Sequence, residues 1–235
     1  MDIQQRIDKI HREQVTEDIN DRGYCCVPEV LTDAECDELI AQYGDEDLYR
    51  KTINMERYRF GVGEYKYFQY PLPPVIQQLR ECVYPQLAVI ANKWMQALNI
   101  DQQFPENLTA LLEHCHAQNQ CRPTPLILKY HKGGYNTLHQ DLYGAVYFPM
   151  QLVLFLNEPD VDYQGGEFVL IEQRPRAQSK AIVLKPRKGD MLLFTTNFRP
   201  VKGSKGYYRV NMKHGVSEIT SGERHTVGII FHDAA

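Results

Sequence analysis

Short apolar runs separated by turn residues follow one another through the second half of the chain. Residues 151–156 form one such run, with the length of a single buried strand. Comparable runs lie at 126–130, 165–170, 189–194 and 224–231, and glycine, proline or asparagine occurs in the segments between them. A series of short strands with turn signals between them predicts a β-sandwich or a barrel.

The first half has the periodicity of helices instead. Three isoleucines between residues 3 and 10 fall on one helical face, and Gly23 ends that region. Thr32 followed by Glu35 forms a capping box, which predicts a helix through about residue 43. Pro74 opens a further helix, whose apolar residues we expect to pack against the strands.

Aromatic and cationic side chains alternate densely between residues 56 and 70. Such interleaving is typical of surfaces that stack nucleic-acid bases. It is also typical of a hairpin that covers a core with its aromatic rings. The sequence favours the hairpin and leaves the stacking function open.

The length and the cysteine content limit the class of protein. A chain of 235 residues fits one domain with a sizeable core. The six cysteines show no metal-finger spacing and the first residues show no signal sequence, so we expect a reduced, cytoplasmic setting. No apolar run has the length needed to span a membrane.

Positive charge is concentrated in one region of the chain. Residues 172–213 contain eleven Lys or Arg and two acids, a net charge of +9, although the whole chain carries −4. An electropositive face of this kind favours a polyanionic partner such as nucleic acid. The alternative is a solvated surface whose cations pair with the acidic N-terminal half.

His139, Asp141 and His214 carry the clearest candidate chemistry. Two imidazoles and one carboxylate are the facial triad of non-haem Fe(II) oxygenases, which leaves three coordination positions free for cosubstrate and oxygen. Asp141 lies two positions after His139, so an extended segment would direct both side chains to one face. His214 must then arrive from a distant strand of the same barrel.

Arg224 follows His214 by ten residues. Its planar guanidinium can grip a carboxylate in two places. Combined with the triad, it fits 2-oxoglutarate, whose keto acid end would chelate iron while its far carboxylate pairs with arginine. Thr226 shares a strand face with Arg224 and would add a hydroxyl hydrogen bond. The alternative role for Arg224 is an ordinary surface ion pair.

Other histidines offer alternative metal ligands. His225 and His232 compete for the third position, but in an alternating strand His225 points away from the face of the neighbouring arginine, which favours the earlier histidine. His114 and His116 flank Cys115, a set that would suit zinc. No second ligand pair lies nearby in the sequence, so a surface position is favoured for this group.

Several motifs resemble the 2-oxoglutarate/Fe(II) dioxygenase superfamily. Residues 165–168, 186–194 and 214–216 are similar to segments of prolyl-hydroxylase-type members, and so is the ten-residue step from histidine to arginine. More narrowly, residues 173–176 and the ending 224–233 resemble a mainly bacterial family catalogued as oxygenases acting on damaged nucleic acid.

The resemblance implies a mainly β fold in a single domain spanning residues 1–235. Residues 123–235 would form a double-stranded β-helix (jelly-roll) core, and residues 1–122 would supply helical support and lid elements. The implied cofactors are Fe(II), 2-oxoglutarate and O2. Tyr130, nine residues before His139, matches a position at which similar enzymes place a tyrosine against 2-oxoglutarate, although barrel packing would explain it equally well.

Three functions remain open at this point. Oxidative demethylation of alkylated DNA or RNA bases would use the basic region 172–213. Hydroxylation of a protein side chain such as proline, or of a small molecule, fits the ten-residue step; related nucleic-acid demethylases usually carry a second arginine at the position of Ile230. A cupin-like module that holds metal without turnover is the third function, and the retained Arg224 argues against it.

Overall fold

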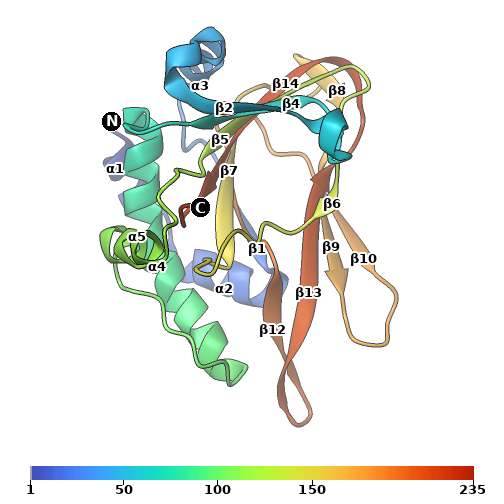
Figure 1. The fold of residues 1–235 in the computed structure, drawn as a ribbon. Helices are drawn as coiled ribbons and strands as arrows, with labels where there is room; N and C mark the ends of the chain where they lie inside the picture. The colour runs from blue at the N-terminus through green and yellow to red at the C-terminus, as the bar shows by residue number, and fades with distance from the viewer. Residues whose placement is uncertain (1) are drawn as a thin grey trace.

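The structure, a computed structural model, describes residues 2–235. Two antiparallel sheets face each other, and the helices gather on the outer side of the larger sheet (Figure 1). The helices are α1 (Ile3–Asp8), α2 (Arg12–Arg22), α3 (Asp33–Ala41), α4 (Pro74–Ala97) and α5 (Leu108–Ala117), with 3-10 turns η1 (Gln42–Gly44), η2 (Glu46–Leu48) and η3 (Met55–Tyr58). The strands are β1 (Tyr24–Val27), β2 (Tyr49–Asn54), β3 (Gly61–Val62), β4 (Glu64–Phe68), β5 (Leu126–His131), β6 (Tyr135–His139), β7 (Met150–Phe155), β8 (Tyr163–Gly165), β9 (Phe168–Gln173), β10 (Lys180–Leu184), β11 (Met191–Thr195), β12 (Phe198–Gly203), β13 (Gly206–Val216) and β14 (Ile219–Ile230).

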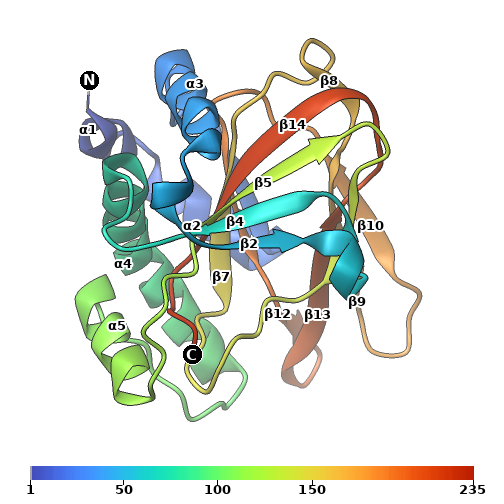
Figure 2. The same ribbon diagram turned by 45° about the horizontal axis from the view of Figure 1, so that its top comes forward.

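The two sheets have interleaved connectivity. The larger sheet has the order β1-β11-β7-β14-β5-β4-β2, with β8 paired to β14. The smaller sheet has the order β10-β9-β13-β6-β3, with β12 paired to β13. Figure 2 shows β9, β10, β12 and β13 of this sheet. Each of the five apolar runs in the second half of the chain contributes to one of these strands, so the predicted series of short strands is confirmed.

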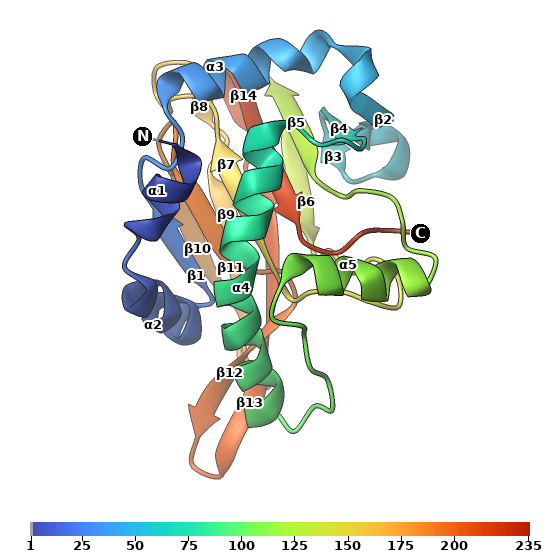
Figure 3. The same ribbon diagram turned by 90° about the vertical axis from the view of Figure 1, so that its left-hand side faces the viewer.

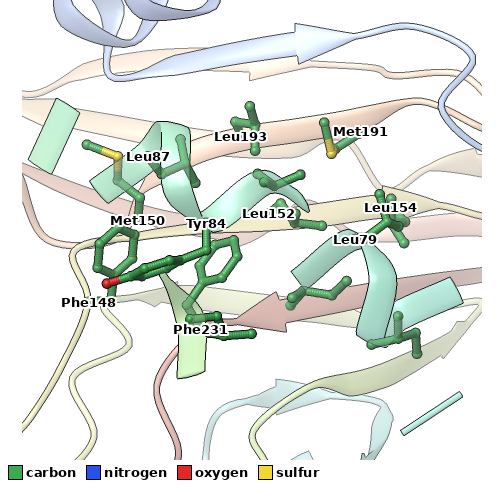
Figure 4. Packing of buried hydrophobic residues seen from close by; sticks show 14 of the residues in the cluster. Leu79, Tyr84, Leu87, Phe148, Met150, Leu152, Leu154, Met191, Leu193 and Phe231 are labelled. Carbon is green, nitrogen blue, oxygen red and sulfur yellow. The ribbon is translucent and has the colours of Figure 1, made fainter. Parts of the chain in front are cut away.

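β7 shows why a continuous apolar run is required at the centre of this fold. All its residues are buried, but alternate residues serve different layers. Met150, Leu152 and Leu154 belong to the core under the helices (Figure 4). Val153 and Phe155 belong to a second cluster, which lies between the two sheets. A strand covered on both faces has no position for a solvent-facing polar residue.

α4 covers the outer face of the larger sheet (Figure 3). It begins at Pro74, as predicted, because proline at the first helical position loses no hydrogen bond. Tyr84 on this helix is fully buried, and its ring centroid lies 5.0 Å from that of Phe148 and 5.8 Å from that of Phe231. Because the helices cover the outer side of the larger sheet, the candidate functional residues lie on its inner side.

The N-terminal part confirms some predictions and departs from others. The capping box of Thr32 and Glu35 opens α3, and Gly23, with φ 80°, ends α2. The helical region before Gly23 is divided into α1 and α2, and Ile10 lies in the break. β1, β2 and β4 belong to the larger sheet, so the first 122 residues do more than supply helical support.

Residues 56–70 contain the second strand of a covering hairpin and an exposed turn. β4 pairs with β2 and with β5, and Phe68 at its end is fully buried. β3 pairs with β6 in the other sheet. The side chains of Tyr58 and Phe60, just before β3, are exposed. The favoured hairpin is thus confirmed only in part, because β2 supplies its first strand from outside the aromatic segment.

Candidate metal centre and cosubstrate pocket

His139 and His214 are neighbours across two paired strands. β6 and β13 run antiparallel, and their register places His214 directly opposite His139. The two imidazole ring centroids are 4.1 Å apart. Strand pairing thus joins two residues that are far apart in the sequence, and a single strand could not have supplied both.

Asp141 lies in the loop that leaves β6, and the loop is held by its neighbours. Gln140 Nε2 donates to the carbonyl oxygens of Asn197 at 2.9 Å and Met212 at 2.7 Å. The backbone N–H of Asp141 donates to Thr196 Oγ1 at 2.8 Å. The extended segment predicted through Asp141 therefore ends at His139, and these hydrogen bonds direct the carboxylate toward the histidines.

The three side chains form a compact group. Asp141 Oδ1 lies 3.6 Å from His139 Nε2, and Asp141 Oδ2 lies 3.3 Å from His214 Nε2. One ligand atom from each residue falls within 4.8 Å of the others, and no other such group of three or more metal-ligating side chains occurs in residues 2–235. The three residues that the sequence predicts as metal ligands are therefore the three that lie together in the fold.

Protonation in this group suits a divalent metal. Burial lowers the pKa of His214, which keeps its imidazole neutral and its nitrogen lone pair available. Burial alone would raise the pKa of Asp141, but its hydrogen bonds with His214 and Gln151 act against burial, and the pKa is well below its usual range. Two imidazoles and one carboxylate are the donor set of a non-haem Fe(II) site, so these residues fit that metal.

Two further residues hold the Asp141 carboxylate, and sequence reasoning missed both. Tyr143 Oη donates to Asp141 Oδ1 at 2.8 Å. Gln151 Nε2 donates to Asp141 Oδ2 at 2.8 Å and lies 3.2 Å from His214 Nε2. The available signal was Gln151 itself, a polar residue in the otherwise apolar run of β7. Groups that orient a ligating carboxylate in this way tune metal affinity.

Arg224 lies on the inner face of the larger sheet. Along β14, His225, Val227 and Ile229 face away from the cavity, and the last two join the core under the helices, whereas Arg224 and Thr226 line the cavity. The structure thus separates Arg224 from His225 as the predicted alternation required. The guanidinium of Arg224 is enclosed by protein on this face, which excludes the alternative role of Arg224 in a surface ion pair.

The Arg224 guanidinium is a buried cation without an acidic partner. It is 1% exposed, and its Nε and Nη2 atoms have no hydrogen-bond partner within the described chain. The guanidinium carbon lies 5.7 Å from the ring centroid of Tyr130, 5.5 Å from that of Phe155 and 5.9 Å from that of Tyr163. An unpaired buried charge is costly, so this arrangement indicates a place for an anion.

Tyr130 and Thr226 lie beside this cation. Tyr130 is paired with Arg224 in the register between β5 and β14, and its buried hydroxyl has no partner among residues 2–235. Burial raises the pKa of Tyr130 to about 12, although Arg224 acts against that shift, so the hydroxyl stays a donor at neutral pH. Thr226 Oγ1 accepts a long hydrogen bond of 3.5 Å from Arg224 Nη1.

One cavity of about 230 Å³ joins these groups. Its polar lining includes the metal-binding group and Arg224 with its neighbours. The rest of the lining is largely apolar and aromatic, and includes Met55, Phe60, Tyr65, Tyr67, Leu126, Leu128, Val153, Phe168, Val216 and Ile230. A metal site and an anion site that share one cavity can bind the two ends of a single small molecule.

The alternative metal residues lie elsewhere. His225 does not line the cavity, and its ring packs against Tyr43 with 5.5 Å between centroids. His232 Nδ1 accepts from the backbone N–H of Phe148 at 3.1 Å. His114 and His116 are exposed, as expected, whereas Cys115 between them is fully buried in α5. None of these residues joins a metal-binding group within the described part of the chain.

The basic region 172–213 divides into paired and unpaired cations. Five of its eleven cations have acidic partners: Arg174 and Arg199 contact Glu172, Lys185 contacts Asp160, Arg187 contacts Glu158 and Lys188 contacts Asp37. The other six, which have no ion pair within residues 2–235, are all exposed: Arg176, Lys180, Lys202, Lys205, Arg209 and Lys213. They lie in or between β9 and β10 and along β12 and β13, whose hairpin extends beyond the rest of the molecule (Figure 1).

Comparison with known protein families gives one match that covers most of the chain. Residues 63–234 match the family Oxygenase-NA, described as "Oxygenase, catalysing oxidative methylation of damaged DNA". Two proteins of Mycobacterium tuberculosis, named "Uncharacterized protein MT2286" and "Uncharacterized protein Rv2227", are each 47% identical over 197 residues, which is 84% of this chain and 79% of theirs.

Solved structures share the fold at low sequence identity. A Pseudomonas putida prolyl-4-hydroxylase superposes with a TM-score of 0.56 at 15% identity, over 95% of this chain and 99% of its own. A Trichoplax adhaerens prolyl hydroxylase gives 0.58 at 14% identity, over 97% and 90%. A Burkholderia pseudomallei oxidoreductase of the 2OG-Fe(II) oxygenase family gives 0.55 at 12% identity, over 97% and 94%. The expected jelly-roll fold is confirmed, and with the metal-binding group it supports the expected cofactor class.

No helix within residues 2–235 combines the length and the apolar character needed to cross a bilayer.

Proposed function

The chain belongs to the Oxygenase-NA family, and from this premise we propose that it is an Fe(II)- and 2-oxoglutarate-dependent dioxygenase that oxidises methyl groups on damaged nucleic-acid bases. The observation that carries the proposal is the shared cavity, in which a two-histidine, one-carboxylate group and an unpaired buried guanidinium meet. We also propose that residues 1–235 act as one domain, because β1, β2 and β4 complete the larger sheet.

In this proposal, His139, Asp141 and His214 hold the metal. Bound Fe(II), with 2-oxoglutarate and O2, supplies the oxidant that converts a C–H bond to C–OH with release of succinate and CO2. Asp141 stays ionised, and Tyr143 and Gln151 fix the orientation of its two oxygens. A metal held by these three residues would keep coordination positions free for small molecules.

Arg224 selects the cosubstrate in the same proposal. Its free Nε and Nη2 donors match the two oxygens of a terminal carboxylate. Tyr130 and Thr226 each add a hydroxyl beside that carboxylate. The apolar lining from Val153 and Phe168 excludes water, which strengthens these charge-assisted hydrogen bonds.

The nucleic-acid substrate is supported by the family description and by the six exposed, unpaired cations on β9–β10 and β12–β13. An oxidant of this kind removes a methyl group from nitrogen rather than adding one. Hydroxylation of the methyl carbon gives an N–CH2OH group, which breaks at the C–N bond to release formaldehyde and leaves the proton on nitrogen.

Turnover with defined substrates tests this proposal. Succinate and formaldehyde are measured with Fe(II), 2-oxoglutarate and O2 in the presence of an N-methylated DNA oligonucleotide, its unmethylated counterpart, a proline-containing peptide or no substrate. We expect the methylated strand alone to stimulate succinate release, with an equal amount of formaldehyde. Stimulation by the peptide alone would assign the enzyme to protein side-chain hydroxylation, and metal binding without any succinate would indicate a binding module.

A further inference from the structure

An exposed aromatic pair lies at the edge of the cavity. Tyr58 and Phe60 are 52% and 45% exposed, and their rings stack with centroids 5.5 Å apart and 18° between planes. Phe60 also lines the cavity that holds the metal-binding group. A side chain that is both half-exposed and part of the cavity wall marks the rim through which a substrate enters.

The turn that carries this pair is fixed to the strand of the first metal-binding histidine. The carbonyl oxygen of Phe60 accepts hydrogen bonds from the backbone N–H and the hydroxyl of Thr137, each at 2.8 Å. At Gly61, with φ 141°, a Cβ atom would lie 2.1 Å from the carbonyl oxygen of Tyr135, so only glycine permits this approach of the turn to β6 (Figure 1). The aromatic pair is therefore presented on a rigid support.

Two further exposed apolar side chains lie close in the chain to the metal-binding residues but do not line the cavity. Leu138 and Leu142 are 46% and 48% exposed, and each is adjacent in the chain to one of the metal-binding residues, His139 and Asp141. Single exposed apolar side chains are unremarkable on protein surfaces, but the stacked pair of Tyr58 and Phe60 at the cavity edge offers a contact surface for a ligand. The preferred ligand must therefore offer an apolar or aromatic face.

The charges beside the aromatic rings identify the rest of the ligand. Arg57 and Arg59 flank Tyr58 in the chain, are exposed and have no ion pair within residues 2–235. Glu56 is the one acidic residue in the turn from 55 to 60. An alternation of cations and exposed aromatic rings matches a nucleic-acid strand, whose bases stack on the rings while its phosphates meet the cations.

We propose that Tyr58 and Phe60 form a stacking platform for an unpaired nucleobase, with Arg57 and Arg59 contacting the adjacent phosphates. The proposal rests on the nucleic-acid substrate argued above and specifies its form: single-stranded nucleic acid, or a base displaced from its duplex. A base inside a duplex has both faces covered by its neighbours and cannot reach the platform without leaving the stack.

The test compares one double variant with the wild type and with one control variant. The substitutions Tyr58→Leu and Phe60→Leu, made together, keep apolar bulk and remove both rings. Val89→Ala is the matched control, because Val89 is 55% exposed on α4, on the other side of the larger sheet from the cavity. Melting temperatures verify that all three proteins are folded. Binding is measured with a fluorescent DNA oligonucleotide carrying one N-methylated base, first as a single strand and then within a perfect duplex.

We expect the wild type to bind the single strand more tightly than the duplex. The double leucine variant should lose about five- to one-hundred-fold in affinity for the single strand, the range expected when base stacking on aromatic rings is removed, and Val89→Ala should lose none. If the wild type turns over methylated DNA and the leucine variant binds the single strand as tightly as the control does, the platform is refuted and the function stands. If the wild type neither binds nor oxidises nucleic acid, both proposals fail.

Discussion

Gln151 Nε2 lies 2.8 Å from Asp141 Oδ2, so one side chain of β7 supports the carboxylate of the metal-binding group. The same nitrogen lies 3.2 Å from His214 Nε2, between two of the three proposed ligands. Gln151 is buried on the inner face of the strand whose outer face packs under α4. The helical layer therefore positions the metal site through alternate residues of one strand.

We predict that Gln151→Leu weakens metal binding. The substitution keeps the side-chain volume nearly constant and removes the hydrogen bond that orients Asp141. Loss of such a supporting group typically costs about 10- to 100-fold in metal affinity. The measurement is a titration with Mn(II) or Fe(II) under anaerobic conditions. An unchanged affinity in a folded Gln151→Leu protein would mean that Tyr143 alone is sufficient to orient the carboxylate.

We predict that Arg224→Lys weakens 2-oxoglutarate binding and that Arg224→Ala weakens it further. Lysine keeps the charge but not the planar pair of donors. Each hydrogen bond to a charged group contributes about 1.5–3 kcal/mol, so the alanine variant should lose at least about tenfold in affinity. Metal affinity should stay unchanged in both variants. A loss of metal binding equal to the loss of cosubstrate binding would contradict the separation of these two roles.

A dicarboxylate without the keto group offers an independent test of the same cation. Glutarate should raise the melting temperature of the wild type, because a ligand that binds only the folded state stabilises it. The Arg224→Ala variant should show no such increase. An equal increase in both proteins would place the dicarboxylate elsewhere.

The unpaired cations predict a specific dependence of DNA binding on salt. Lys202→Ala with Lys205→Ala should reduce the slope of log affinity against log salt by about 1.4, because each phosphate contact to a single strand contributes about 0.7. Lys185→Ala is the control, since Asp160 already neutralises that cation at 2.6 Å. If the two variants changed the slope equally, the distinction between paired and unpaired cations would have no bearing on binding.

His232 predicts a loss of stability in mild acid. Burial lowers the pKa of its imidazole to about 4 from 6.5, with Arg80 adding to the effect and Asp141 and Asp233 opposing it. Between these two pH values the unfolded chain binds a proton that the folded chain does not, so the free energy of unfolding falls as the pH drops below 6.5. The contribution between pH 7 and pH 5 is about 2 kcal/mol.

His232→Asn isolates that contribution. Asparagine can keep an acceptor near the backbone N–H of Phe148, and it does not titrate. Urea unfolding at pH 7 and pH 5 should show a smaller stability difference in the variant than in the wild type. The exposed histidine variant His131→Asn should behave as the wild type does. The same pH dependence in all three proteins would exclude His232 as the titrating group.

Much of the site could be predicted because side-chain alternation along a strand is a local property. In β14 that rule alone separated Arg224 from His225, and the structure places them on opposite faces. Tyr143 could not be predicted in the same way. Its hydrogen bond to Asp141 depends on the path of the loop between β6 and β7, which no periodicity describes.

Two features of the fold depend on long-range contacts and could not be predicted from the sequence. Lys66 is 5% exposed in the middle of β4, where its ammonium group pairs with Glu46 and lies 4.6 Å from the ring centroid of Tyr43. The partners of this lysine lie outside the strand, so its burial could not be predicted from the local sequence. The break between α1 and α2 is the other feature. Ile10 packs against the core although it lies in neither helix, so the spacing of the three isoleucines continues across the break.

We propose that His139, Asp141, His214 and Arg224 form one site for Fe(II) and 2-oxoglutarate. Anaerobic calorimetric titration of 2-oxoglutarate, with and without Fe(II), tests it most directly in the wild type, in Asp141→Ala and in the surface variant His131→Ala. We predict that Fe(II) strengthens 2-oxoglutarate binding strongly in the wild type and in His131→Ala, and not at all in Asp141→Ala. Binding that is independent of Fe(II) in the wild type, or equally dependent on it in Asp141→Ala, would contradict the account.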